Sequence, residues 1–171
     1  MVTQFGESFV GESVNAAHLN TVLGEKGGPV EVAWVTSLAT PAVGLVRFVT
    51  VLQPGLPVKP MTLFVPKAAI ESDLHGRMTW GPAQAGVAAG VAGAVAEGIV
   101  DAARVDDLLL IAAVWVNPLA DDEQAVFANN RDATRLALEA GARGLPRLDD
   151  VLAARDAPCN PFFPGPQRSG S

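Results

Sequence analysis

Apolar and polar positions alternate in some segments of this chain and recur at helical spacing in others. Alternating or β-branched apolar runs predict strands over residues 5–14, 16–23, 45–52, 61–65 and 106–116. Helical spacing, with its start and stop residues, predicts helices over residues 30–39, 82–97, 121–142 and, in a shorter piece, 148–155. Strands and helices are mixed without a regular strand–helix–strand alternation. We therefore expect an α+β fold with a largely antiparallel sheet packed with helices.

Spacing within these segments also indicates which side chains share a face. In the second expected strand, period-two spacing places His18 and Asn20 on one face, so their side chains point the same way. Any chemistry at His18 would then have Asn20 as a neighbour. The first expected helix rests on apolar residues that recur at a spacing of three, namely Val32, Val35 and Leu38.

The best-defined helix pattern opens at Pro82, a residue suited to a first helical turn, and stops at Gly98. The small residues along this helix that would permit close packing are Gly86, Ala89, Gly90 and Gly93. A helix face made of small side chains is compatible with packing between subunits and equally with packing inside one subunit.

The amino-acid composition of the chain changes at Gly144. Residues 1–143 are interpreted as one domain, and 171 residues in all are about one domain's worth. Residues 144–171 form a Pro/Gly-rich C-terminal tail, in which residues 157–171 are expected to be extended or mobile.

Composition and charge narrow the functions that remain. Only 18% of the residues are charged, and the formal net charge is −6 without a basic cluster, so neither nucleic acid nor an anionic membrane is an expected partner. The longest apolar run, residues 108–116, is less than half of the roughly 20 residues that a membrane span needs. Residues 1–12 lack the basic and apolar regions of a signal peptide, so we expect a cytoplasmic, reduced protein.

Metal and nucleotide chemistry find little support in the sequence. Two histidines without zinc-type spacing and a single cysteine, Cys159, argue against a metal site and an internal disulfide. The sequence also lacks a phosphate-binding glycine loop and a serine nucleophile elbow. We therefore expect chemistry that needs no metal.

Three residues are candidates for contact with a small molecule. His18 suits acid–base catalysis, because histidine exchanges a proton readily near neutral pH; the alternative is a polar residue on a half-buried strand. Lys67, isolated between apolar segments, would meet an anionic or carbonyl group or would simply be solvated. Gln84 would offer its amide to a heterocycle or to water, and Trp80 is expected in the core rather than as a ligand platform.

Short motifs along residues 5–142 carry a family resemblance. They are 6–12 (GESFVGE), 17–20 (AHLN), 24–29 (GEKGGP), 56–63 (LPVKPMTL), 80–84 (WGPAQ), 94–99 (AVAEGI), 106–108 (DDL), 120–122 (ADD) and 133–136 (ATRL). In this order, and without large gaps, they resemble the formaldehyde-activating enzymes. Each motif alone is weak, but together they are specific.

The resemblance implies a fold, an assembly and a reaction. The fold would be like the second domain of ribosomal protein S5, assembled as a homopentamer with the substrate pterin between neighbouring subunits. The reaction would condense formaldehyde with tetrahydromethanopterin to methylenetetrahydromethanopterin and water, without a metal. An amine adds to formaldehyde easily, and a general acid then accelerates the loss of hydroxide by about 10²–10⁴-fold.

Three positions keep the family's functional residues. The proton donor of the family falls on His18. Its pterin-binding lysine and glutamine fall on Lys67 and Gln84. The resemblance therefore implies a catalytic acid and two cofactor-binding groups in this chain.

Other positions depart from the family pattern. The family's aspartate falls on Asn20, which lacks the charge but keeps an acceptor oxygen. Its leucine in the middle strand falls on Val49, and its threonine falls on Ala69, which has no hydroxyl. Pro66 stands where the family has asparagine, and Asn117 where it has a later histidine.

The leading hypothesis is an enzyme of this family with His18 as general acid, Lys67 and Gln84 holding the pterin, and Asn20 orienting it. The alternative is a non-catalytic or retuned paralogue that binds a pterin or another small amine without turnover, which the changes at Asn20 and Ala69 motivate. A third hypothesis is an interaction protein whose Pro-rich tail contacts a partner.

Overall fold

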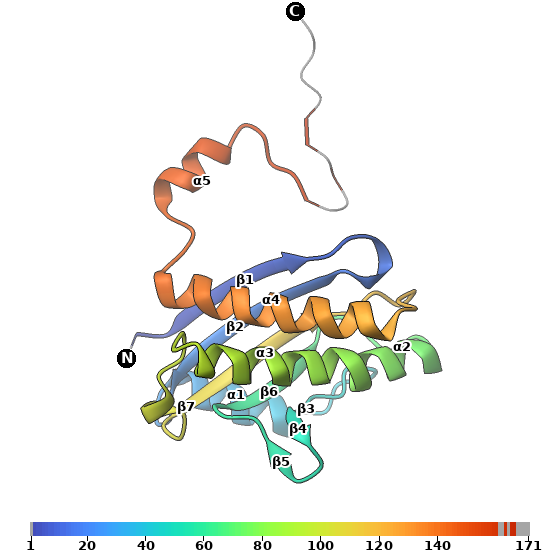
Figure 1. Cartoon of the computed structure of the whole chain (residues 1–171), viewed down its shortest axis with the longest axis vertical. Coiled ribbons are helices and arrows are strands. Elements are labelled where there is room, and N and C mark those ends of the chain that lie inside the picture. The colour runs from blue at the N-terminus through green and yellow to red at the C-terminus, as the bar shows by residue number, and fades with distance from the viewer. Residues whose placement is uncertain (1, 161–162, 164, 167–171) are drawn as a thin grey trace, which may run out of the picture.

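The computed structural model describes residues 2–160, 163 and 165–166 (Figure 1). Its main sheet has the strand order β1-β2-β7-β6-β3. These strands are β1 (Gln4–Val10), β2 (Ala17–Glu25), β7 (Leu108–Trp115), β6 (Met61–Pro66) and β3 (Phe48–Val49). A separate ribbon pairs β4 (Val51–Gln53) with β5 (Leu56–Pro57). The expected α+β class is confirmed.

The main sheet is mixed. Strand pairs β1–β2, β2–β7 and β3–β6 are antiparallel, whereas β6 and β7 run parallel. A parallel pair needs a crossover connection, and the helices between β6 and β7 provide it. The expectation of a largely antiparallel sheet is therefore met for three pairings, and the fourth differs because of this crossover.

Helices cover the two faces of the sheet unequally (Figure 1). The helices are α1 (Pro29–Ala39), α2 (Asp73–Met78), α3 (Gln84–Ala96), α4 (Glu123–Arg143) and α5 (Leu148–Ala154). The main core lies between the sheet and the pair α3 and α4, with Leu19, Phe64 and Leu110 fully buried in it. On the other face, a smaller core gathers Val30 and Trp34 of α1 against β6 and β7.

The outer face of α1 is apolar and uncovered. Val30 and Trp34 contact the sheet, so the residues whose spacing predicted this helix point away from it. Val32, Val35 and Leu38 are 69%, 53% and 42% exposed. The helix was predicted correctly, but its recurring apolar residues lie outside the subunit core.

The predicted start of the helix at Pro82 is wrong, because helical structure begins earlier, at Asp73. Ser72 caps α2 by accepting a hydrogen bond from the backbone N–H of His75. A π-helical segment, Thr79–Ala83, then joins α2 to α3 and contains Pro82, whose missing N–H is tolerated in this widened turn. Gly98 follows α3 with a φ of +75°, which agrees with the predicted stop.

The single strand expected over residues 45–52 is divided in two. Thr50 separates β3 from β4 and is fully buried. Its N–H donates to the Thr62 carbonyl at 2.9 Å, and its carbonyl accepts from Val58 N–H at 3.1 Å. The chain therefore passes from the edge of the main sheet into the small ribbon within one residue.

The last part of the chain follows the predicted pattern. Asp122 caps α4 by accepting from the N–H groups of Gln124 and Ala125, and Gly144 ends the helix in the left-handed conformation. Helix α5 stands apart from the body in Figure 1. The expectation for residues 157–171 falls partly outside the described residues. Among the described residues, every helix is too short or too polar to span a bilayer.

Candidate active site

The candidate residues on β2 lie on the sheet face that α1 covers only in part. His18 and Asn20 point to this face, as the alternation predicted, while Leu19 and Thr21 are buried on the opposite face. Val22, the next residue on the same face, packs into the small core under α1. The stretch of β2 that carries His18 and Asn20 therefore lies beyond the cover of that helix.

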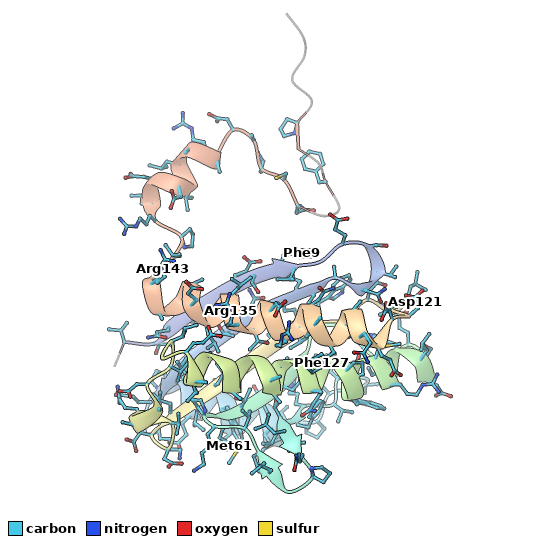
Figure 2. The ribbon with its side chains drawn as sticks, in the orientation of Figure 1. Phe9, Met61, Asp121, Phe127, Arg135 and Arg143 are labelled. Atoms are coloured by element: carbon cyan, nitrogen blue, oxygen red, sulfur yellow. The ribbon has the colours of Figure 1, made fainter. Side chains whose placement is uncertain are left out.

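His18 is held by a carboxylate from the neighbouring strand. Its Nε2 lies 3.0 Å from Oε1 of Glu7, and its ring lies 5.8 Å from the ring of Phe9. Figure 2 marks Phe9 on β1. Among the described residues, Nδ1 of His18 has no hydrogen-bond partner, so one ring nitrogen is anchored and the other can face a reactant.

Lys67 reaches across the sheet to the same place. It follows β6, and its Nζ donates to Oδ1 of Asn20 at 2.5 Å and lies 3.5 Å from the His18 carbonyl oxygen. Partial burial lowers the pKa of Lys67, and the negative charge of Glu7 opposes this shift. The structure thus brings three predicted residues, His18, Asn20 and Lys67, into one cluster.

A hollow of about 520 Å³ lies at the strand neighbours of His18, and none of His18, Asn20 and Lys67 lines it. Phe9 and Trp115, the strand neighbours of His18 on either side, form two of its walls. Residues 11–14 and Asn117 complete the lining. A hollow with aromatic walls is suited to a flat, polar heterocycle, and both walls come from residues paired with His18 in the sheet.

Val49 and Gln84 form a second group, separate from His18. Two strands, β7 and β6, lie between β2 and β3, which carries Val49. Val49 and Gln84 line a hollow of about 330 Å³ together with Trp80. The side-chain oxygen Oε1 of Gln84 accepts a hydrogen bond from Val51 N–H at 2.6 Å. The NH₂ group of the same amide can therefore donate to a ligand. Trp80 is 49% exposed, so the expectation that it lies in the core is wrong.

Ala69 lies beyond the end of β6, beside the segment that follows α1. A Cβ built on Gly44 would be 3.0 Å from the Ala69 methyl group, and the Gly44 carbonyl accepts from Ile70 N–H. A hydroxyl at position 69 would therefore face this segment and solvent. The structure places Ala69 near Lys67 in the chain but in neither hollow.

His75 is a structural residue. It is 1% exposed, and its Nε2 lies 3.1 Å from the Val116 carbonyl oxygen. Its Nδ1 accepts from the backbone N–H of Glu71 at 3.3 Å. The ring therefore ties α2 to the end of β7 and has no nitrogen left for a substrate.

Replacing His75 by alanine is expected to lower the free energy of unfolding by about 3 kcal/mol, since a buried ring is lost and two backbone groups lose partners. Chemical denaturation monitored by far-UV circular dichroism measures this. Leu74→Ala is the control, because Leu74 lies on the same helix and is 37% exposed. Equal losses in the two variants would show that the hydrogen bonds of His75 contribute little.

Glu7 is a site residue that the analysis of single segments missed. It lies in the glycine-flanked motif 6–12 and faces Asn20 in the β1–β2 pairing. Glu7 could have been identified by pairing the first two strands as an antiparallel hairpin, because such pairing brings alternate residues of both strands to one face. The sequence of the connection between the two strands does not determine which residues pair across the hairpin.

No group of three or more histidine, cysteine, aspartate or glutamate side chains that could hold a metal ion occurs in the described ranges. The chemistry of the cluster is that of an imidazole, a carboxylate, an amine and an amide. Such a set can transfer protons and bind or attack a carbonyl compound.

Comparison with known proteins gives consistent matches. The sequence model of the formaldehyde-activating enzyme family matches residues 5–163, which extends past Gly144 and beyond the end of α5. The division of the chain at Gly144 stays a prediction. A 5,6,7,8-tetrahydromethanopterin hydro-lyase of Methanosarcina barkeri is 36% identical over 157 residues, covering 92% of this chain and 88% of the relative.

Longer relatives match over only part of their length. A bifunctional enzyme Fae/Hps of Methanococcoides burtonii is 38% identical over 151 residues, which are 88% of this chain and 38% of the relative. The same kind of enzyme from Methanosarcina mazei is 36% identical over 149 residues, or 87% and 38%. The chain thus spans well under half the length of these bifunctional relatives.

Proposed function

We propose, because the chain belongs to the formaldehyde-activating enzyme family, that it condenses formaldehyde with tetrahydromethanopterin to give methylenetetrahydromethanopterin and water. The observation that carries this proposal is the cluster of His18, Glu7, Asn20 and Lys67 beside an aromatic-walled hollow. Tetrahydromethanopterin acts here as the substrate that accepts the carbon.

His18 would act as the general acid of this reaction. Addition of a pterin amine to formaldehyde gives a hydroxymethyl amine, which must lose its oxygen as water. Proton donation from Nδ1 of His18 to that oxygen makes it a better leaving group. Glu7 would hold Nε2 and balance the positive charge of the protonated ring.

Asn20 would keep one part of the family's usual arrangement. Its amide oxygen accepts from Lys67 Nζ at 2.5 Å, as a carboxylate oxygen would. The negative charge that the resemblance places at this position is absent, and Glu7 is the acidic residue whose charge raises the pKa of the amine. The amide nitrogen of Asn20 is then available to orient a pterin carbonyl.

Val49 and Gln84 would contribute from a neighbouring subunit. They line a hollow that does not include His18, so one subunit does not gather all the family's binding positions. A homopentamer with the pterin between subunits, as the resemblance implies, would bring the two groups together. The exposed apolar face of α1 supports assembly, because a face of this kind is normally covered. The fold would be that of the second domain of ribosomal protein S5.

The rate of methylenetetrahydromethanopterin formation tests the proposal. Formaldehyde and tetrahydromethanopterin are mixed with and without the protein, and the spontaneous rate is subtracted. We expect a rate that rises in proportion to protein concentration. A rate equal to the background, from folded protein at several concentrations, would refute the proposed activity.

A second candidate function is binding without turnover, which the changes at Asn20 and Ala69 favour. Each lost polar group is worth about 1–3 kcal/mol if its partner on the pterin is buried. Calorimetry would then show pterin binding by a protein that does not accelerate the reaction. Acceleration, or the lack of any pterin binding, would exclude this function.

Removing the charge of Glu7 is expected to slow the reaction. Glu7→Gln keeps the shape and an acceptor oxygen but no longer balances the protonated ring of His18, so we expect kcat to fall about tenfold with little change in KM. Steady-state kinetics over pterin concentration measures this.

The matched control for Glu7→Gln is Glu97→Gln. Glu97 is an exposed glutamate at the end of α3, with an ion pair to Arg135 at 3.4 Å. The Glu97→Gln variant should leave kcat and KM unchanged. A similar loss in the two variants, or a Glu7→Gln loss that lies wholly in KM, would contradict the role given to Glu7.

A further inference from the structure

The amine of Lys67 differs from the other lysine amines of the chain in its surroundings. The sequence contains three lysines. Lys59 forms an ion pair with the carboxylate of Asp106, and Lys26 donates to the backbone carbonyl of the same residue. Lys67 instead contacts two neutral oxygens, the Asn20 amide and the His18 carbonyl.

These surroundings give Lys67 a larger share of uncharged amine than a lysine paired with a carboxylate has. No carboxylate lies within ion-pair distance of Nζ among the described residues, and burial lowers the pKa of the group. Glu7 is the one acidic residue that opposes this, and its carboxylate is engaged with His18. A lysine amine with a lowered pKa, in the same cluster as a proton donor, can form a Schiff base with a carbonyl compound.

We propose that Lys67 captures formaldehyde covalently before the carbon passes to the acceptor amine. The inference rests on the proposed function for the identity of the carbonyl substrate. It adds a nucleophile to a site in which Lys67 was otherwise expected only to hold the pterin. Asn20, where the resemblance places aspartate, contacts the amine without adding a negative charge.

The proposed steps balance in atoms and charge. The Lys67 amine adds to the carbonyl carbon, a C–N bond forms, and the proton lost from nitrogen goes to the oxygen. His18 protonates the resulting hydroxyl, the C–O bond breaks, water leaves and the nitrogen lone pair closes a C=N bond. A pterin amine then attacks this carbon, and the π electron pair of the C=N bond returns to the Lys67 nitrogen. A proton passes from the attacking nitrogen to the Lys67 nitrogen, the remaining C–N bond to Lys67 breaks with its electron pair on the released amine, and the lone pair of the pterin nitrogen forms a new C=N bond. Closure of the pterin ring by its second nitrogen returns a proton to His18.

Reductive trapping of the C=N bond tests the inference without any assay of turnover. The full-length protein is mixed with formaldehyde and cyanoborohydride at neutral pH, and methylation of each lysine is followed over time by peptide mass spectrometry. We expect Lys67 to be methylated several-fold faster than Lys26 and Lys59 in the same molecules. In urea-unfolded protein, the three lysines should react at similar rates.

Asn20→Asp is the decisive variant, because it places a carboxylate at hydrogen-bond distance from Nζ and favours the charged amine. Methylation of Lys67 should slow to the rate of Lys59, while Lys26 and Lys59 remain unchanged. Lys67 reacting no faster than the other two lysines in the folded wild-type protein would overturn the inference. Equal Lys67 rates in wild type and Asn20→Asp would also overturn it.

Adding tetrahydromethanopterin before the reductant separates this inference from the proposed function. Loss of the Lys67 adduct on addition of the pterin would support both. Selective methylation of Lys67 that the pterin leaves unaltered would support capture at Lys67 and count against the pterin as acceptor. Acceleration of pterin condensation by a protein whose Lys67 is never selectively methylated would support the proposed function and refute capture.

Discussion

His18→Ala is expected to lower the protein-dependent rate of methylene-pterin formation by about 10²–10⁴-fold, the range in which a positioned general acid acts. The variant loses the only imidazole of the cluster, and the described neighbours offer no substitute: Glu7 is a carboxylate anchored to that ring, and Lys67 is engaged with Asn20. Pterin binding should persist, because the aromatic walls of the adjacent hollow remain. Stopped-flow absorbance after subtraction of the spontaneous rate measures the loss.

His18→Gln serves as the matched variant in this experiment. Glutamine can still donate a hydrogen bond toward Glu7 but cannot supply a proton to a leaving oxygen. The protein-dependent rate should therefore fall by the same factor in both variants. Neither should unfold, since His18 has a 38% exposed side chain whose ion pair with Glu7 is worth at most about 1 kcal/mol. Full activity in either variant would assign the acid to another group and leave His18 as a polar strand residue.

The elements with a strong local pattern were predictable from sequence. The alternation around His18 and Asn20 corresponds to β2, whose alternate residues are buried as expected. Helix α4 begins after the Asp122 cap and ends at Gly144. An aspartate cap and a terminal glycine are start and stop residues that can be recognised in the sequence. In these segments, the tertiary contacts and the local preferences agree.

Other elements depend on contacts that no local pattern contains. α2 is a short helix of six residues, which Ser72 caps and His75 ties to the end of β7. The parallel pairing of β6 with β7 follows from the crossover through α2 and α3, which can be placed only once the sheet order is known. The exposure of Val35 on α1 likewise reflects which side of the helix meets the sheet.

The candidate site was predictable in its members more than in its arrangement. The family resemblance named His18, Asn20 and Lys67, and the structure brings these three together. The same resemblance named Val49 and Gln84, which lie by a different hollow. The two groups line no common hollow, and the pattern of a single segment does not show how far apart the fold places it from another segment.

Gly90→Ala is expected to lower the free energy of unfolding by about 3 kcal/mol, because α3 and α4 pack at a distance that leaves no room for a methyl group. A Cβ at position 90 would lie 2.5 Å from the Arg131 carbonyl oxygen and 2.7 Å from the Thr134 Cβ. Both atoms belong to the rigid middle of α4, so relief requires the helices to separate over the main core. Thermal unfolding at one protein concentration should show a fall in Tm of about 6 °C or more.

Gly93→Ala on the same helix is the matched control and is expected to have the opposite sign. A Cβ at position 93 would meet no atom within 4 Å, so the substitution changes only the backbone preference, which favours alanine over glycine in a helix by about 0.5–1 kcal/mol. The glycines of α3 thus divide into two that the α4 contact requires, Gly86 and Gly90, and one that it does not, Gly93. A loss of stability in Gly93→Ala that grows with protein concentration would place this position in a contact between subunits. Equal and small changes in both variants would mean that α3 and α4 are packed less closely than the structure shows.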